Sequence, residues 1–181
     1  MRLVLVLAVV LLGCGPRRGP EPGGTYFWQI QTSALEWGAC SDAPALRMGT
    51  AAIPFESNSF LVYKVDAAGK RAVSQTCPRL DVSTCTDTAS GIVFDVAGTE
   101  LTFVAERSDV ISGTECKLHQ LETWSLKDEI ETMTLDISTV LSLVDSPTAC
   151  PMVEASLKSQ STNQQGVEGC VLTRTLTGVL R

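Results

Sequence analysis

The sequence predicts an all-β protein, a single domain built as an antiparallel meander of about eight strands. Apolar and polar residues alternate along most of the chain after Tyr26, β-branched and aromatic residues gather in short runs, and Gly, Asp, Ser and Pro separate those runs. No helical stretch is long enough for the crossover that joins parallel strands. The length of 181 residues suits one domain with a sizeable core and is short for two.

Eight runs carry this pattern most clearly. They are Tyr26–Gln31, Ser59–Asp66, Ile92–Ala97, Glu100–Ser108, Cys116–Leu126, Met133–Val144, Met152–Lys158 and Cys170–Val179. Gly98-Thr99 predicts a tight hairpin turn between two of them. Polar turns are expected at Lys127–Glu131, at Asp145–Ala149 and at Ser159–Gly169, the last of which is either a partner-contacting loop or a plain hairpin tip.

The segment 130–144 fits two periods. Ile130, Met133, Ile137, Leu141 and Val144 would line one face of a helix, which Ser125 and Asp128 could cap. A strand places Leu135 and Leu143 on the apolar face as well, whereas the helix leaves both off it. We therefore favour a strand, one of about 40 Å at 3.3 Å per residue, which should bend or bulge.

A meander of this size usually closes or folds on itself, because closure removes exposed sheet edges. The expected architecture resembles the up-and-down barrel of lipocalins, with a β-sandwich as the alternative. The resemblance is architectural only, since Gly24-Thr25-Tyr26-Phe27-Trp28 stands where lipocalins have Gly-X-Trp. Seven aromatic residues could line the barrel interior, either around one small apolar ligand or as packed core: Tyr26, Trp28, Phe60, Tyr63, Phe94, Phe103 and Trp124.

The N-terminus has the form of an export signal. Arg2 precedes an apolar run, Leu3–Leu12, which would span only about 15 Å as a helix, roughly half of a bilayer core. The run ends in Leu11-Leu12-Gly13-Cys14, which resembles the bacterial lipobox, although Leu12 is larger than the residue usual at its position. The resemblance implies cleavage before Cys14, a diacylglyceryl group on its sulfur, and a protein that is lipid-anchored and does not span the membrane.

The resemblance divides the chain into three parts. Residues 1–13 are the signal, residues 14–24 are the lipidated Cys14 with a flexible Gly/Pro tether, and residues 25–181 are one disulfide-stabilised domain. Gly15 is not the Asp that retains lipoproteins in the inner membrane of some Gram-negative bacteria. We therefore expect the cell envelope, and the outer membrane ahead of the inner.

Cys14 leaves six cysteines, which in an exported protein should form three bridges out of 15 connectivities. If the last two strands pair across 159–169, Cys150 lies about 25 Å from Cys170, beyond the reach of a disulfide. Following the strands places Cys85, Cys116 and Cys150 at one end of the sheet and Cys170 at the other. The predicted pairs are Cys77–Cys85, Cys116–Cys150 and Cys40–Cys170.

Charge and residue content argue against several activities. The net charge of -6, or -7 without the signal and its Arg2, disfavours nucleic acid as a partner. The single histidine, His119, is expected on the solvent side of its strand, and no Gly-X-Ser-X-Gly elbow accompanies it. We expect no metal and no cofactor, because zinc sites draw on several His or free Cys and the cysteines are committed to bridges.

Two acidic patterns remain. A carboxylate pair for glycoside hydrolysis could come from five strand residues, which fit a solvated face better: Glu100, Glu106, Glu122, Asp136 and Glu154. Asp81–Asp87 has oxygen-bearing side chains at alternate positions, as calcium loops do, but Cys85 interrupts it and the turn glycine is missing. A Cys-closed surface loop is the expectation there.

The leading functional hypothesis is a membrane-anchored envelope lipoprotein that acts as a non-enzymatic binding or structural module, its partners being the membrane and an envelope protein. The alternatives are a barrel carrier of a lipid or other small apolar ligand, and an envelope hydrolase that uses a carboxylate pair.

Overall fold

The computed structural model describes residues 19–44, 46, 59–89, 91–129 and 131–181. The expected signal at 1–13, the expected lipidation site Cys14 and the first part of the expected tether lie outside these residues, as does Ile130. Within the described ranges, no helix has both the length and the apolar content needed to cross a membrane.

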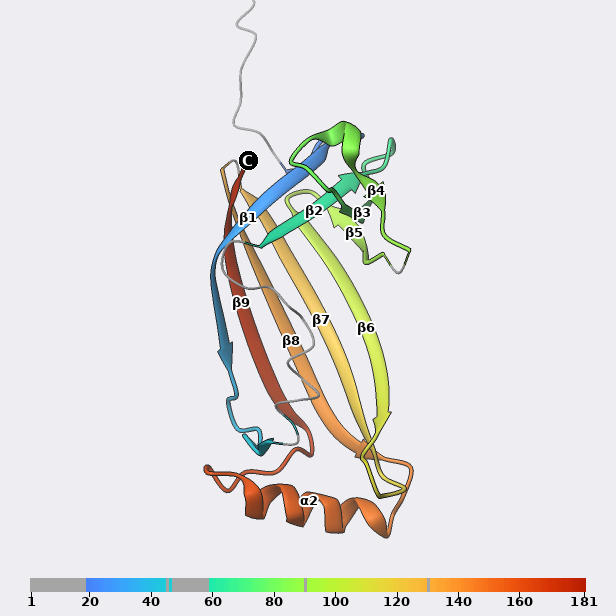
Figure 1. The fold of residues 1–181 in the computed structure, drawn as a ribbon, viewed down its shortest axis with the longest axis vertical. Helices are drawn as coiled ribbons and strands as arrows, with labels where there is room; N and C mark the ends of the chain where they lie inside the picture. The colour runs from blue at the N-terminus through green and yellow to red at the C-terminus, as the bar shows by residue number, and fades with distance from the viewer. Residues whose placement is uncertain (1–18, 45, 47–58, 90, 130) are drawn as a thin grey trace, which may run out of the picture.

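The chain forms a closed antiparallel eight-stranded β-barrel with one extra strand (Figure 1). The elements are β1 Thr25–Glu36, β2 Phe60–Val65, β3 Arg71–Thr76, a 3-10 helix η1 Val82–Thr84, β4 Thr86–Asp87, β5 Val93–Ala97, β6 Glu100–Val110, β7 Lys117–Glu129, β8 Thr132–Val144, α2 Ala149–Gln160 and β9 Cys170–Leu180. Neighbouring barrel strands follow chain order, and β9 returns to β1. The predicted meander and barrel are confirmed, and the sandwich alternative is not formed. The extra strand β4 pairs with β3.

β8 settles the ambiguous segment as a strand. It pairs with β7 in one unbroken register and with β9 on its other side. Leu135 is fully buried and Leu143 packs against the core, so the strand buries side chains that a helix would have exposed. The strand curves without a bulge (Figure 1), and the register shift of the barrel lies in β1, between Ile30 and Thr32.

The strand predicted at Met152–Lys158 is wrong, because this segment belongs to helix α2. Cys150, Val153 and Leu157 are its buried residues, and their spacings of three and four are those of one helix face. The sequence pattern did not predict β3, whose only fully buried residue is Ala72. A strand with so little apolar contrast gives almost no alternation signal.

Strand length divides the barrel into two halves. β2, β3 and β5 have six, six and five residues, whereas β1 and β6 to β9 have between eleven and thirteen. The short strands close the barrel over one half, which we call the closed half. Beyond it the long strands continue as a curved five-stranded sheet toward α2, and this part we call the open half (Figure 1).

Each half has its own core. The closed half buries Trp28, Tyr63, Phe94 and Trp124 with surrounding aliphatic side chains. At the far end of the open half, Val153 and Leu157 of α2 pack against strand residues and against cysteines 40, 116 and 150. Strands β2, β3 and β5 are too short to reach this end of the sheet. Helix α2 therefore covers an apolar surface that these strands leave exposed.

All three predicted disulfides are confirmed. The Cα–Cα distances are 5.1 Å for Cys40–Cys170, 4.1 Å for Cys77–Cys85 and 5.1 Å for Cys116–Cys150. The premise that placed Cys170 at the opposite end from Cys116 and Cys150 is wrong, because α2 turns the chain back at the same end. Cys77–Cys85 instead closes a local loop around η1, which lies at the end remote from α2 (green in Figure 1).

The last residues of the predicted tether are in contact with the barrel. They form no helix or strand, as expected, but Gly23 N donates to Asp66 O at 3.1 Å and Glu21 N donates to the Tyr26 hydroxyl at 2.6 Å. Gly19 has a φ of 79° and lies so close to Gly98 that an added Cβ would stand 2.2 Å from the Gly98 carbonyl oxygen. The chain therefore enters the domain beside the β5–β6 turn, at the end opposite α2 (Figure 1).

Asp42 fastens the segment after β1 to the residues that follow α2. Its carboxylate accepts hydrogen bonds from the backbone N–H of Thr162 at 2.8 Å, from the Ser161 hydroxyl at 2.7 Å and from the Thr162 hydroxyl. The Thr162 hydroxyl and then the Ser161 hydroxyl hold the pKa of Asp42 well below its ordinary value of 3.8.

We expect the stabilisation from Asp42 to depend on pH. Because the folded-state pKa is depressed, the contribution is complete above the ordinary value of 3.8 and is lost as pH falls through the lower folded-state pKa. Asp42→Asn should therefore unfold more easily than wild type at neutral pH, and the difference should shrink in acid. Urea titrations of both proteins between pH 2 and pH 7 measure it, and a difference that stays constant across this range would refute the assignment.

Candidate binding surfaces

Aromatic side chains occupy the interior of the closed half. Tyr26, Trp28, Tyr63, Phe94 and Trp124 are buried there, and Phe103 packs against them partly buried. Their rings form a connected cluster, with centroid distances of 5.3 Å for Tyr26–Tyr63, 6.3 Å for Phe94–Trp124 and 5.7 Å for Phe103–Trp124. Six of the seven predicted lining residues thus meet in one place, where their rings pack against one another.

Phe60 is the exception, and its assignment to the interior is wrong. It is 41% exposed, opposite Gln29, while Leu61, Tyr63 and Val65 of the same strand are buried. Since side chains alternate along a strand, Phe60 and Tyr63, three positions apart, cannot share a face. Applying that rule to the sequence would have shown that only one of these two aromatic residues can face the interior.

A buried hydrogen-bond chain crosses the closed half. Trp28 Nε1 donates to the Tyr63 hydroxyl at 3.4 Å, and that hydroxyl donates to Asp128 Oδ2 at 2.6 Å. Burial, followed by the hydrogen bond to Asp128, raises the pKa of Tyr63 far above its ordinary value, so the phenol stays protonated. The chain satisfies polar groups inside an aromatic core and holds the rings in a fixed arrangement.

Beyond the short strands, β6 has an edge that no described strand covers. β5 pairs with β6 only at Glu100, Leu101 and Thr102, whereas β7 pairs with β6 along its whole length. Ile111 N donates to Cys116 O and Asp128 N donates to Thr99 O, both at 2.9 Å, so odd-numbered residues on this side of the hairpin face β7. The backbone groups of Val104, Glu106, Ser108 and Val110 accordingly point toward the uncovered edge.

The β6–β7 loop and α2 form a groove of about 900 Å³ at the same end. Its loop side runs from Ile111 to Glu115, and its helix side includes Met152, Val153 and Leu157. Val153 and Leu157 are buried against the barrel, but Met152 is 69% exposed and borders the groove. The groove therefore offers aliphatic surface beside hydroxyl groups and one carboxylate, from Glu115.

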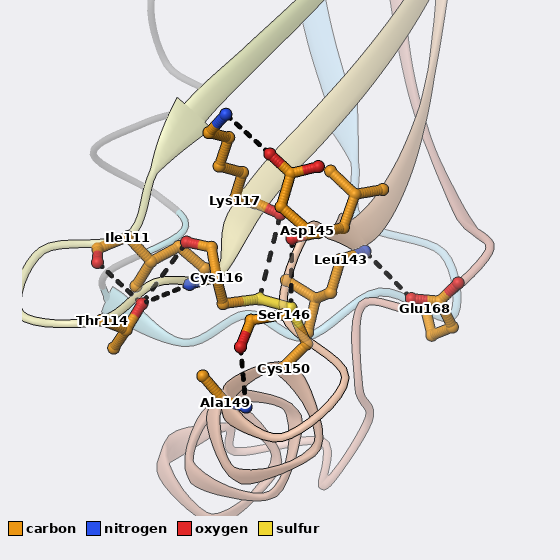
Figure 2. The surroundings of a disulfide bond; sticks show 11 residues. Ile111, Thr114, Cys116, Lys117, Leu143, Asp145, Ser146, Ala149, Cys150 and Glu168 are labelled. Atoms are coloured by element: carbon orange, nitrogen blue, oxygen red, sulfur yellow. Dashed lines mark hydrogen bonds and ion pairs between the residues drawn. A yellow bond between two sulfur atoms is a disulfide. The ribbon is translucent and has the colours of Figure 1, made fainter.

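The Cys116–Cys150 disulfide holds the two sides of this groove together (Figure 2). Cys116 N donates to the Thr114 hydroxyl at 3.1 Å, and that hydroxyl donates to Ile111 O at 2.9 Å, so the loop is tied down next to the bridge. Ala149 N donates to Ser146 Oγ at 3.1 Å at the start of α2. These contacts make the groove a preformed surface.

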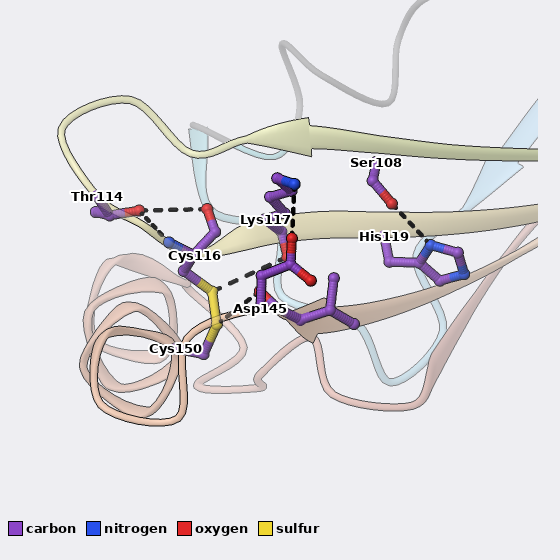
Figure 3. A network of polar contacts seen from close by, with 8 residues as sticks. Ser108, Thr114, Cys116, Lys117, His119, Asp145 and Cys150 are labelled. Carbon is purple, nitrogen blue, oxygen red and sulfur yellow. Dashed lines mark hydrogen bonds and ion pairs between the residues drawn. A yellow bond between two sulfur atoms is a disulfide. The ribbon is translucent and has the colours of Figure 1, made fainter.

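His119 lies on the outer side of β7, as predicted, and Figure 3 shows its imidazole directed toward Ser108 of β6. Its Nδ1 is 3.0 Å from Ser108 Oγ, and its Nε2 is 3.2 Å from Glu106 Oε1. Ser108, His119 and Glu106 are the residue types of a serine hydrolase triad, but all three lie on the outer face of a sheet. The edge N–H groups of Glu106 and Ser108 are parallel and about 6.8 Å apart, too far to converge on one oxyanion.

The five carboxylates considered for glycoside hydrolysis are dispersed. Each accepts from or pairs with a different group: Glu100 with Ser125, Glu106 with His119, Glu122 with Trp124, Asp136 with Thr175, and Glu154 with the backbone N–H of Val167. None of these contacts joins two of the five. A glycosidase needs two carboxyl groups aimed at one bond, and the contacts of these five bring no two of them together.

Residues 81–85 belong to the surface loop that Cys77–Cys85 closes, as expected, and residues 86 and 87 form β4. Asp81 caps η1 by accepting from Ser83 N at 3.0 Å, which lowers the pKa of Asp81, and Asp87 accepts from Gln75 Nε2 at 2.9 Å. Both carboxylates thus have protein partners. Across the part of the chain that the structure describes, no three His, Cys, Asp or Glu side chains assemble into a metal-binding group.

Comparisons with known proteins identify no family for this chain. No protein-family model, no curated protein and no solved structure matches the chain.

Proposed function

We propose that the chain is a lipid-anchored envelope protein, held at the outer membrane through Cys14, which acts as a non-enzymatic binding module. The observation that carries this proposal is the difference between the two ends of the barrel. The domain begins next to the β5–β6 turn, while the preformed groove and the uncovered edge of β6 lie toward α2. A tether at Cys14 would hold the first end toward the membrane and present the second to a partner.

The distance between the ends supports this arrangement. β6 has eleven residues between the β5–β6 turn and the β6–β7 loop, which is about 35 Å of strand. The groove would therefore stand clear of lipid headgroups while the anchor fixes the protein to the surface. Two or three acyl chains on Cys14 would make dissociation from the membrane negligible.

The packed interior favours this proposal over a carrier. A small apolar ligand in the closed half would have to displace rings that contact one another and are almost fully buried. A ligand gains little by entering a space that protein side chains already fill, because the contacts it makes replace contacts it breaks.

Photo-crosslinking in the native host tests the binding role. A benzoylphenylalanine placed at Met152, on the groove, should give one discrete adduct on irradiation of intact cells. The matched control is Leu80, which is 52% exposed in the Cys77–Cys85 loop at the other end and should give no adduct. Adducts from position 80 alone, or from neither position, would contradict the proposal.

The hydrolase alternative has its own readout. Purified protein should leave ester and glycoside substrates intact. Hydrolysis that disappears in His119→Ala, or in an alanine variant of one of the five carboxylates, would establish catalysis and replace the binding proposal.

A further inference from the structure

We propose that the uncovered edge of β6 binds an extended peptide segment of the partner, which adds to the sheet as an antiparallel strand. This inference rests on the proposed function, because it names the chemistry by which the module would bind. The edge runs from Val104 to Val110, and alternate residues along it direct both an N–H and a C=O away from β7. Such a row of backbone groups is the template for strand addition.

The side chains along this edge are exposed on the outer face. Val104 and Val110 are each 61% exposed, and the Glu106 side chain is 69% exposed between them. In an antiparallel complex, residues 1, 3, 5 and 7 of the bound peptide would stand opposite Val110, Ser108, Glu106 and Val104. The edge therefore selects an aliphatic residue at position 1, Lys or Arg at position 5, and an aliphatic residue at position 7.

Charged side chains on the inner face of β6 limit which other strands can pair with its uncovered edge. Arg107 Nε contacts Asp109 Oδ2 at 2.7 Å, so these two charges are paired within the strand. Inward-facing charges on an edge strand discourage indiscriminate sheet-to-sheet association. The acidic net charge of -6 and the exposed Glu106 further favour a cationic peptide over a second copy of this acidic chain.

The edge continues directly into the groove. Val110 ends β6, and the next residue, Ile111, begins the loop that lines the groove against α2. The N-terminal end of an antiparallel peptide would reach this loop, where Met152 is exposed. Backbone pairing along β6 and apolar contact in the groove would thus belong to one binding surface.

Selection from a phage library of random twelve-residue peptides, against the full mature lipoprotein in detergent, tests the inference. The enriched peptides should carry the pattern aliphatic, three residues, Lys or Arg, one residue, aliphatic. A synthetic peptide of the selected sequence, labelled for fluorescence anisotropy, should bind Ser108→Pro at least tenfold more weakly than wild type. Proline removes an edge N–H and blocks approach, while the pairing with β7 depends on the odd-numbered residues.

Ser108→Ala is the matched control. It removes the same contact with His119 but keeps the backbone N–H, so binding should stay within twofold of wild type. Equal loss in both variants, or the absence of any enriched peptide, overturns the inference. A dimer of the wild-type protein that dissociates in Ser108→Pro would also overturn it, because the edge would then bind a second copy of the chain. If Met152→Lys loses peptide binding while Ser108→Pro binds the peptide like wild type, the peptide occupies the groove alone. That result would contradict strand addition to β6 and would agree with the proposed function.

Amide hydrogen exchange gives a second test that needs no folded proline variant. Adding the peptide to wild-type protein should slow exchange at Glu106, Ser108 and Val110. Exchange at Arg107 and Asp109, whose N–H groups already face β7, should change little. Uniform protection across the strand, or none, would contradict strand addition.

Discussion

Phe94→Ala should lower the free energy of unfolding by about 3–5 kcal/mol, the usual cost of deleting a fully buried aromatic side chain. Phe94 is completely buried and contacts Tyr63, Phe103 and Trp124 at ring distances of 6.1–6.5 Å. Its removal would leave a cavity that the barrel wall cannot collapse to fill, because the surrounding strands are hydrogen-bonded on both sides.

The matched control for this variant is Phe60→Ala. It deletes the same side chain from the outer face of β2, where the side chain is 41% exposed, and should cost less than about 1 kcal/mol. Urea unfolding followed by tryptophan fluorescence measures both variants. Equal losses would mean that Phe60 also belongs to the packed interior. A small loss at Phe94 would mean that the interior is loosely filled, which would revive the carrier alternative.

Removal of the Cys40–Cys170 disulfide should have the other large effect. The bridge closes 130 residues of sequence, and loop-closure entropy for that length corresponds to about 5 kcal/mol of stability. The double variant Cys40→Ala with Cys170→Ala should lose a stabilisation of this order. The local bridge Cys77–Cys85, with a separation of eight, should cost about 2–3 kcal/mol when both its cysteines become alanine.

The two double variants should also differ in which part of the molecule shows faster amide hydrogen exchange. Without Cys40–Cys170, hydrogen exchange should rise first in α2 and in residues 161–166, which Asp42 and Ser41 hold against the end of β1. Without Cys77–Cys85, exchange should rise only around η1 and β4. Equal stability losses in the two variants, or loosening of the closed half in both, would contradict the division of the molecule into two cores.

The fold was predictable where burial imposes a period of two. β8 is the clearest example, since Leu135 and Leu143 decided for a strand over a helix, and the structure buries Leu135 fully and packs the partly buried Leu143 against the core. β3 and α2 were not predictable in this way. Ala72 is too small to mark a face, and α2 is a short helix whose apolar spacing of three and four residues sits beside Met152, which is exposed.

The disulfides show how a correct prediction can follow from a premise that is partly wrong. Cys170 does lie far from Cys85, but it lies at the same end as Cys116 and Cys150, because α2 carries the chain across that end. The pairing survives since a bridge between Cys40 and Cys170 joins the end of β1 to the start of β9, which are adjacent strands.

The binding surfaces lay beyond reach of the sequence. The uncovered edge of β6 exists because β5 stops pairing at Thr102 while β6 continues to Val110. The relative lengths of β5 and β6 in the folded sheet determine whether this edge is covered, and the residues of β6 alone do not indicate it. Val104, Glu106, Ser108 and Val110 share the outer face of β6, but a shared face does not distinguish a central strand from an edge strand.

We propose that Cys14 carries a lipid, and an anchor there would give the two ends of the barrel different roles. Growth of the native host with radiolabelled palmitate, followed by immunoprecipitation of the wild-type chain and of Cys14→Ala, tests it most directly. We expect label in wild type, no label in Cys14→Ala, and release of that variant from the membrane fraction. Equal label in both proteins, or no label in either, would contradict it.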